Sequence, residues 1–417
     1  MNLILFTSSF PYVRGGDANF LNVEVQHLVK EFDRVIVVPE FIKASKLPEH
    51  AALEVDTGYA ELLASRSILD LSQLAFSSQI LPYGYGEPNF PRLSFTAWRR
   101  LIAFCGKAEL VRRWTLDFLR KQNLNPEECI FYTYWFDNAA AGIGMVKKDH
   151  PRLRLVSRAH NYDLYEEQYY DPPFFPCRNF TLNLVDRLFL CSFDGVEYMR
   201  AKYPQHVSRY QTSLLGVKDP GFITEASTDG VFRIVSCSFL RPEKRVDLLL
   251  EAFSLASRMR PGQRMEWRHI GNGEERAQLQ KKADNILLES AKAFFIEYID
   301  NRALMGFYRK NPVDVFVNVS RTEGIPVSIM EASSCGIPVV ATAVGGNAEI
   351  VSEQNGILLD KDPSLDEIAS AIFRMIDGPK ESSKKRFGGR NVWKTQYNAH
   401  LNFLDFAQTL KHIRLRD

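Results

Sequence analysis

The segment from Asp314 to Gly346 constrains the fold more than any other part of the sequence, because it alternates short apolar runs with turns. An apolar run, Asp314 to Ser320, is followed by a polar turn and by the segment Pro326 to Ser334. After Gly336 comes a second apolar run, Ile337 to Thr342. This order is typical of a strand, a loop, a short helix and a second strand. The segment therefore predicts an α/β domain with buried strands.

The loop that precedes the predicted helix is suited to a phosphate group. Pro326 suits the first helical position, and Gly324 lets the backbone approach a ligand closely. The first amides of a helix carry a partial positive charge and attract anions. Glu323 lies immediately before this loop, and Glu331 falls in the middle of the helix among apolar residues. A carboxylate in such surroundings needs a polar partner.

The two acids form a recognisable pattern, since seven residues separate Glu323 from Glu331. The segment resembles the Glu-x7-Glu signature of the family 4 retaining glycosyltransferases, followed by their Gly-Gly-x-x-Glu turn, here Gly345, Gly346 and Glu349. In that family the first Glu lies beside the donor sugar and the second binds the ribose hydroxyls. The backbone between them meets the sugar and the diphosphate, a role that falls here to Gly324, Ile325, Pro326 and Val327. From the residues alone, a loop cap and a solvated helix residue remain the alternative for the two acids.

Bulk properties set the limits of this interpretation. A chain of 417 residues exceeds one ordinary core and predicts two domains. A hydrophobic content of 45% is that of a globular protein, and a net charge of +2 does not call for a nucleic-acid partner. The six cysteines are scattered with no C-x-x-C pair, which predicts reduced thiols in a cytoplasmic protein. Met1 to Phe10 predicts a first strand rather than a signal peptide, and no stretch is long enough to cross a membrane.

The N-terminal part predicts a first β-α-β unit. Asn2 to Phe10 and Arg34 to Pro39 are strand-like, and Gly15 and Gly16 stand before the intervening helix. A turn at this place is where open α/β sheets bind ligands. It resembles the glycine loop of the same family, whose amides approach the diphosphate when the two domains close. A simple turn is the alternative.

His160 follows a predicted strand, Leu153 to Ser157. The sequence Arg-Ala-His-Asn-Tyr-Asp-Leu-Tyr-Glu around it resembles the His loop of the family, in which the His lies beside the donor sugar. We therefore take His160 as a site residue, with a structural His as the alternative.

A basic segment, Trp98 to Lys121, has helical spacing and carries seven cations among large aromatic side chains. One interpretation is an amphipathic surface that contacts an anionic membrane, which would suit a lipid-linked acceptor. The alternative is a packing helix with a solvated basic side.

The second half repeats the alternation of strands and helices predicted for the first half, and it begins with a predicted strand from Phe232 to Ser238. The next loop resembles the family's Gly-Arg-Leu-x-Pro-x-Lys segment, whose Arg and Lys neutralise the diphosphate. Lys244 matches its Lys, but Ser238-Phe239 replaces its Gly-Arg, so Arg241 or Arg245 would have to supply the second cation. Further on, a glycine turn that contains Gly271 and Gly273 follows another strand and is a second, weaker phosphate signal.

The resemblance implies the GT-B architecture, in which two Rossmann-like α/β domains face each other across a cleft. We expect an acceptor-binding domain at residues 1–217, a nucleotide-sugar-binding domain at 218–390 and a C-terminal helix at 391–417 that returns to the first domain. The polar run Asp219 to Gly230 reads as the linker. Asp360-Lys361-Asp362 lies at the end of a repeat, where an exposed turn is expected, so no metal is assigned.

The sequence is similar to the bacterial exopolysaccharide transferases of the amylovoran and colanic acid type. The resemblance implies metal-independent transfer, with retention, from a UDP- or GDP-linked sugar to a growing lipid-linked glycan, without a cofactor. We expect a cytoplasmic enzyme at the inner face of the plasma membrane. Two alternatives stay open: a nucleotide-sugar 2-epimerase of the same architecture, and a silent nucleotide-sugar-binding protein, since the family's Arg is replaced at Phe239.

Overall fold

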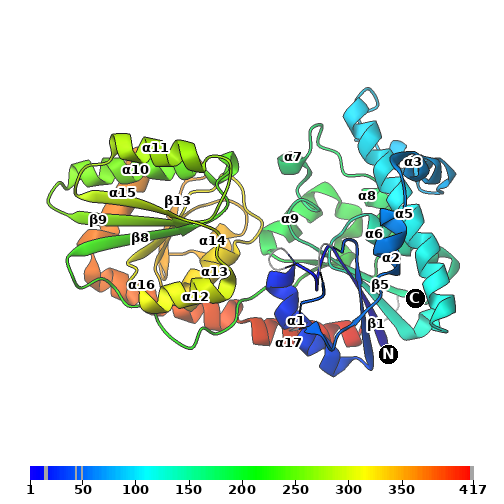
Figure 1. Cartoon of the computed structure of the whole chain (residues 1–417). Helices are drawn as coiled ribbons and strands as arrows, with labels where there is room; N and C mark the ends of the chain where they lie inside the picture. The colour runs from blue at the N-terminus through cyan, green and yellow to red at the C-terminus, as the bar shows by residue number, and fades with distance from the viewer. Residues whose placement is uncertain (14–16, 43–44, 48–49, 414–417) are drawn as a thin grey trace. The chain divides into compact units, whose positions relative to one another are not determined.

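The computed structural model describes residues 1–13, 17–42, 45–47 and 50–413, and the chain forms two compact units (Figure 1). Unit 1 comprises Met1–Leu214 together with the chain from Phe403 onward, and unit 2 comprises Leu215–Asn402. Each unit is a parallel sheet flanked by helices. The α/β class predicted from the sequence is confirmed in both units.

Unit 1 is built on a seven-stranded sheet whose order is β3-β2-β1-β4-β5-β6-β7. Every neighbouring pair of strands is parallel. Its strands are β1 (Asn2–Thr7), β2 (Arg34–Pro39), β3 (Glu54–Val55), β4 (Cys129–Thr133), β5 (Arg154–Ala159), β6 (Arg187–Leu190) and β7 (Tyr210–Thr212). The central strands are buried almost throughout, as parallel strands covered on both faces must be. The order reverses between β1 and β4, and open α/β sheets bind ligands at such a point.

Helices cover the faces of this sheet. They are α1 (Ala18–Glu31), α6 (Asn138–Asp149), α8 (Arg178–Leu184), α9 (Phe193–Lys202) and α17 (Ala399–Lys411), while the short α7 (Glu166–Tyr169) lies in the loop that follows β5. Between β3 and β4 the chain forms four more helices: α2 (Gly58–Ala64), α3 (Ile68–Ser77), α4 (Leu81–Tyr85) and α5 (Phe95–Lys121). The helix expected over Trp98 to Lys121 is therefore confirmed, and the Ser94 side chain caps its start by accepting from the amide of Ala97. Within the described residues, no helix combines the length and the apolar character needed to cross a membrane.

Unit 2 carries a six-stranded sheet in the order β10-β9-β8-β11-β12-β13, again parallel throughout. Its strands are β8 (Val231–Cys237), β9 (Arg264–Ile270), β10 (Ala291–Ile296), β11 (Val315–Asn318), β12 (Val339–Thr342) and β13 (Gly356–Leu359). Its helices are α10 (Val246–Met259), α11 (Arg276–Ile286), α12 (Asn301–Lys310), α13 (Val327–Ser334), α14 (Asn347–Ile350), α15 (Leu365–Asp377) and α16 (Pro379–Gln396). The order strand, loop, helix and strand predicted for the segment Asp314 to Gly346 is confirmed as β11, α13 and β12.

The C-terminal helical pattern is divided into two helices, because α16 ends at Gln396 and α17 begins at Ala399. The residues between them bond to the chain near Val217. The amide of Val217 donates to the carbonyl oxygen of Tyr397 at 3.0 Å, and the amide of Ala399 donates to the carbonyl oxygen of Val217 at 3.2 Å. A side chain at Gly216 would lie 2.6 Å from the nitrogen of Ala399, so this close crossing requires glycine.

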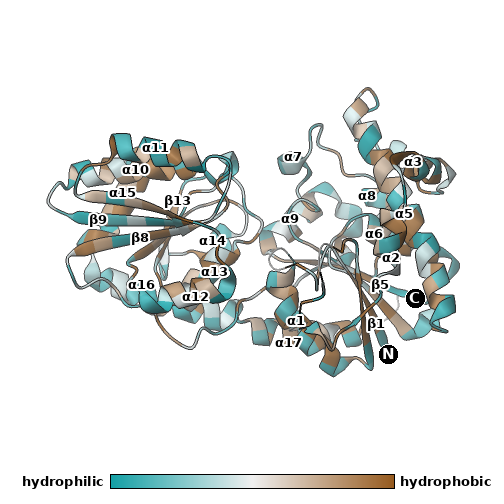
Figure 2. Ribbon diagram, viewed as in Figure 1, coloured by the Kyte–Doolittle hydropathy of each residue, from teal (hydrophilic) through white to brown (hydrophobic). Residues whose placement is uncertain are grey.

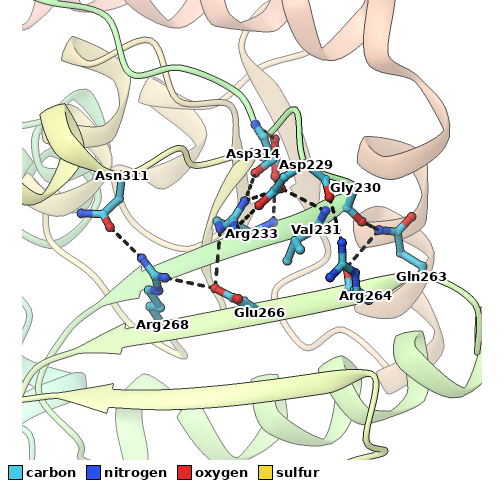
Figure 3. A network of polar contacts seen from close by, with 11 residues as sticks. Asp229, Gly230, Val231, Arg233, Gln263, Arg264, Glu266, Arg268, Asn311 and Asp314 are labelled. Atoms are coloured by element: carbon cyan, nitrogen blue, oxygen red, sulfur yellow. Dashed lines mark hydrogen bonds and ion pairs between the residues drawn. The ribbon is translucent and has the colours of Figure 1, made fainter.

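The polar run Asp219 to Gly230 has no helix or strand, but it is fixed to unit 2. Its anchor is Asp314, whose carboxylate accepts from the amides of Ser227 at 2.9 Å and Arg233 at 2.7 Å. Figure 3 shows how Asp229 and Glu266 approach the guanidinium group of Arg233 in the same network. Asp314 thus joins the run to the start of β8.

We expect Asp314→Ala to destabilise the protein by about 1–3 kcal/mol, because two half-buried backbone amides lose their acceptor. Urea unfolding measures the loss. Asp229→Ala is the matched control, since it removes a largely exposed carboxylate of the same network and should cost clearly less. An equal loss for the two variants would contradict the assignment.

Candidate functional site

Lys244 and Glu323 meet in unit 2, as the sequence led us to expect of two residues in one site. The Lys244 Nζ donates to Glu323 Oε1 at 2.7 Å, and the Asn318 Nδ2 reaches the same oxygen at 3.2 Å. Lys244 ends a short 3-10 turn after β8, whereas Glu323 lies between β11 and α13. Glu323 is 8% exposed, so its carboxylate is held in a fixed position by a cation and an amide.

The backbone around Glu323 is held by neighbouring loops. The amide of Gly346 donates to the carbonyl oxygen of Gly324 at 2.7 Å, and the amide of Arg321 donates to the carbonyl oxygen of Glu243 at 2.8 Å. Gly345 has φ +47°, and a Cβ there would lie 1.9 Å from the carbonyl oxygen of Glu323. Only glycine permits this approach.

The helix after this loop begins one residue later than predicted. Pro326 is the extended residue before α13, so Val327 and not Pro326 is the first helical residue. Ile325 packs beside the same turn, since a Cβ on Gly346 would lie 3.1 Å from its side chain. The amides of the first helical turn have no partner within the helix, so this end of α13 suits an anion.

Glu331 is buried in the middle of α13, and it has the polar partner that we expected for a buried carboxylate. Its carboxylate accepts from the Asn301 side chain at the start of α12. Burial raises the pKa of Glu331 to about 7, while the bond from Asn301 acts in the opposite direction. Near neutral pH this carboxyl group is therefore partly protonated and can both donate and accept, as hydroxyl groups of a ligand require.

The glycine turn after β9 closes against the loop after β8. The amide of Leu240 donates to the carbonyl oxygen of Asn272 at 3.0 Å. A Cβ on Gly273 would lie 2.1 Å from the carbonyl oxygen of Leu240, and one on Gly271 would lie 1.9 Å from that of Ser238. These glycines serve this contact between loops, a role that the phosphate prediction did not include.

A surface pocket lies between the same two loops, and Arg241 belongs to its lining. The guanidinium carbon of Arg241 lies 5.3 Å from the ring centre of Phe239, and both side chains are exposed. Phe239, which replaces the family's Arg, therefore lies beside the guanidinium group of Arg241. This arrangement favours Arg241 as the second cation of the loop.

Arg245, the other candidate cation, is committed elsewhere. It is buried, and it donates to the carbonyl oxygens of Val319, Ser320 and Lys361 and to the carboxylate of Asp362. This network fixes the ends of β11 and β13 to the start of α10, so Arg245 is a structural residue. It also engages one acid of the Asp360-Lys361-Asp362 turn. The described residues contain no cluster of His, Cys, Asp or Glu side chains that could hold a metal ion.

His160 lies in unit 1, at the end of β5, and is held on every side. Its Nε2 donates to the carbonyl oxygen of Tyr134 at 3.0 Å, and its Nδ1 lies 3.3 Å from the Cys191 Sγ. Asp163 accepts from the amide of His160 at 2.9 Å and so fixes the loop. Burial, reinforced by the charge of Arg158, lowers the pKa of His160 to about 3. The imidazole is therefore neutral and serves as a hydrogen-bonding group rather than a cation.

Gly15 and Gly16 lie outside the described residues, so their part in the site stays a prediction.

Sequence reasoning missed the residues that hold the predicted ones. Asn318 and Asn301 fix the two glutamates, and Asp163 fixes the His loop. The position of Asp163, three residues after His160, was a readable signal, because Asp side chains often accept from nearby amides. Asn301 gave no signal, since its contact with Glu331 joins two helices distant in sequence.

Comparison with known protein families gives a match over most of unit 2. Residues 224–391 match the family model described as "Glycosyl transferases group 1". The match includes Lys244, Glu323 and Glu331.

Curated relatives cover only part of the chain. Amylovoran biosynthesis glycosyltransferase AmsK of Erwinia amylovora is 26% identical over 195 residues, which cover 43% of this chain and 45% of AmsK. O-antigen biosynthesis glycosyltransferase WbnH of Escherichia coli is 27% identical over 39% of this chain and 46% of its own length. The matches thus span less than half of these relatives.

Solved structures extend the similarity to both units. The lipopolysaccharide outer core galactosyltransferase WaaB aligns over 98% of this chain and 99% of its own, with a TM-score of 0.69 and 14% identity. Anabaena HepE, solved with UDP and glucose, aligns over the same shares with a TM-score of 0.64 and 16% identity. The chain has the GT-B fold. AmsK, WbnH and WaaB are all named as glycosyltransferases.

The pKa of Glu331 predicts how stability depends on pH. Its carboxyl group ionises near 4.5 in an unfolded chain but near 7 when folded, so the unfolded state releases its proton first as pH rises. Stability should fall by at most about 1.4 kcal/mol per pH unit across this window and level off above it. Glu331→Gln removes the titration and keeps an acceptor for Asn301. Urea unfolding of both proteins at several pH values should show the variant gaining relative stability through the window; a constant difference would contradict the assignment.

Proposed function

We propose that this protein is a retaining glycosyltransferase that moves a sugar from a nucleotide diphosphate sugar to a growing, lipid-linked glycan. The observation that carries the proposal is the Lys244–Glu323 pair beside the start of α13. A cation, a carboxylate and helix amides at one place match the needs of a substrate with a diphosphate next to a sugar.

In this proposal the main catalytic task is to stabilise the leaving diphosphate, on which negative charge develops. Lys244, Arg241 and the amides of Gly324, Ile325 and Val327 supply positive charge and hydrogen-bond donors without a metal. Glu323 orients the sugar through its hydroxyl groups, and Glu331 binds the ribose hydroxyls. The position of His160 beside the donor sugar, which the resemblance implies, stays a prediction.

The donor site can be tested with a panel of UDP- and GDP-linked sugars in a metal-free buffer. We expect Lys244→Ala to reduce release of the nucleotide diphosphate about 100- to 1000-fold, the scale of one lost oxyanion donor. Glu323→Ala should also abolish release, whereas Lys281→Ala, which removes an exposed lysine of α11, should leave it unchanged. Turnover that survives both site substitutions would overturn the proposed site.

The same assay separates the alternatives. An epimerase would release a free sugar with no acceptor present, and a silent binding protein would retain the nucleotide without turnover even when lipid-linked acceptors are added. If the nucleotide binds without turnover, Phe239→Arg tests whether the lack of turnover is caused by the missing family arginine.

Membrane contact is a further part of the proposal, and the contacts of the α5 side chains bear on where it lies. On α5, Glu109 pairs with Arg112 and Arg113, and Asp117 pairs with Arg120 and Lys121. Arg100 donates to the carbonyl oxygens of Pro172 and Phe174. Each of these cations has a partner in the protein, which favours the packing helix, although Arg113, Arg120 and Lys121 remain exposed.

Apolar side chains of the neighbouring segment are the better candidates for contact with lipid. Ile68 and Leu69 at the start of α3 are 84% and 74% exposed, and Leu93 and Phe95 before and within the first turn of α5 are largely exposed too. Figure 2 shows the hydrophobic colour of α3. We propose that these side chains enter the surface of the membrane that holds the acceptor, at its cytoplasmic face.

Sedimentation with phosphatidylglycerol and phosphatidylethanolamine vesicles tests this contact. We expect the double variant Ile68→Ser, Leu69→Ser to lose most of the vesicle-bound fraction, because it removes two exposed apolar side chains. Phe387→Ser is the matched control, since Phe387 is 70% exposed but lies in unit 2. Equal binding by the wild type and the double variant would contradict the proposal.

A further inference from the structure

Unit 1 has a small pocket at the carboxyl edge of its sheet, at the point where the strand order reverses between β1 and β4. Its lining comes from the ends of three strands and from two helices. Among the lining residues are Thr7 at the end of β1, Glu40 after β2, Trp135 and Asp137 after β4, and Tyr59 on α2. Its place is the one where open α/β sheets bind ligands.

Two buried donor groups line this pocket. The Tyr59 side chain is 1% exposed, and in the part of the chain that the structure describes its hydroxyl group makes no hydrogen bond of normal length, although the Asn138 side chain is near enough to lower its pKa. The indole Nε1 of Trp135, which is buried as well, has no hydrogen-bond partner among the described residues. A buried polar group that loses its partner typically costs about 1–3 kcal/mol. Two such groups at one pocket point to a ligand that accepts from them.

Two carboxyl groups face the same space. Asp137 caps α6 by accepting from the amide of Ala139 at 2.9 Å, and Glu40 accepts from the Lys107 ammonium at 2.6 Å. Burial, together with the nearby charge of Glu40, raises the pKa of Asp137 to about 8. Asp137 is therefore largely protonated at neutral pH, while Lys107 offsets the charge of Glu40. Burial and the charges of Glu40 and Asp137 also raise the pKa of Tyr59, while the Asn138 side chain acts in the opposite direction.

The pocket therefore presents donors and acceptors together, with little net charge. A sugar hydroxyl group both donates and accepts, so an adjacent pair of them satisfies such a lining. An anion would meet two carboxyl groups, and a purely apolar ligand would leave Tyr59 and Trp135 unsatisfied.

We propose that this pocket binds one edge of an uncharged sugar ring through adjacent hydroxyl groups, which accept from Tyr59 and Trp135 and donate to Asp137 and Glu40. It is then the subsite that selects the acceptor glycan, a role that rests on the transferase function proposed above. The ring of Trp135 lies 4.6 Å from the ring of His160 and 4.8 Å from that of Tyr162. These rings extend the wall of the pocket toward the His loop.

Binding is tested directly by saturation-transfer NMR titration of the whole chain with methyl glucoside, methyl galactoside and methyl mannoside. We expect at least one of them to bind in the millimolar range. Tyr59→Phe should weaken binding about tenfold, by loss of one hydrogen bond to the ligand. Asp137→Asn keeps a residue that caps helices well and should weaken it similarly.

Tyr397→Phe is the matched control, because it removes a buried hydroxyl group without a described partner from unit 2. It should leave the Kd for the glycoside unchanged, and thermal melting shows whether all variants fold. Equal affinity of Tyr59→Phe and the wild type, or no binding of any neutral glycoside, would overturn the inference. Tighter binding of methyl glucosaminide or methyl glucuronide would also overturn the inference, since the pocket would then prefer a charged sugar.

The outcome of the donor experiment is independent of the outcome of the glycoside titration. Tyr59→Phe should leave the Kd for UDP- or GDP-linked sugars unchanged, and Lys244→Ala should leave the Kd for the methyl glycoside unchanged. Glycoside binding without any nucleotide-sugar turnover would keep the sugar pocket and reject the transferase.

Discussion

Parallel pairing of the strands is the constraint on which both units depend. All strands of a parallel sheet end at the same edge, so every loop that follows a strand gathers there. In unit 2 the loops after β8, β9, β11 and β12 meet in this way and bring Lys244 to Glu323. In unit 1 the loops after β1, β2 and β4 form the sugar pocket, and the loop after β5 carries His160. The helices that cover both faces bury the strands and keep the edge free for ligands.

Contacts between loops give this edge its rigidity. The loop after β8 bonds to the loop after β9, and the loop after β11 bonds to the loop after β12. Glycines at 273 and 345 permit both contacts, since a side chain at either would collide with a facing carbonyl oxygen. A site held by its backbone needs little rearrangement to meet a ligand, and this preorganisation contributes to affinity and to catalysis.

Local pattern predicted β11, α13 and β12 and the meeting of Lys244 with Glu323, because spacing and a matching motif lie within short segments. It did not predict the helices α2, α3 and α4. Contacts between distant segments were not readable: Arg245 bonds to Asp362 across 117 positions, which turned a candidate ligand of phosphate into a structural residue. The pairing of Glu109 with Arg113 was readable from its four-residue helical spacing, and it gives the buried Glu109 a partner on the basic helix. The sugar pocket gave no signal, since Tyr59 and its other residues come from separate elements.

Because Lys244 is already bonded to Glu323, an anionic ligand that binds Lys244 must replace the carboxylate of Glu323. A phosphate group that takes the ammonium of Lys244 leaves the Glu323 carboxylate with Asn318, and departure of the phosphate restores the original pair. The affinity for an anion is then the difference between two ion pairs rather than the strength of one. A spent nucleotide would then meet Glu323 as an internal competitor for the Lys244 ammonium, and this competition would favour its release.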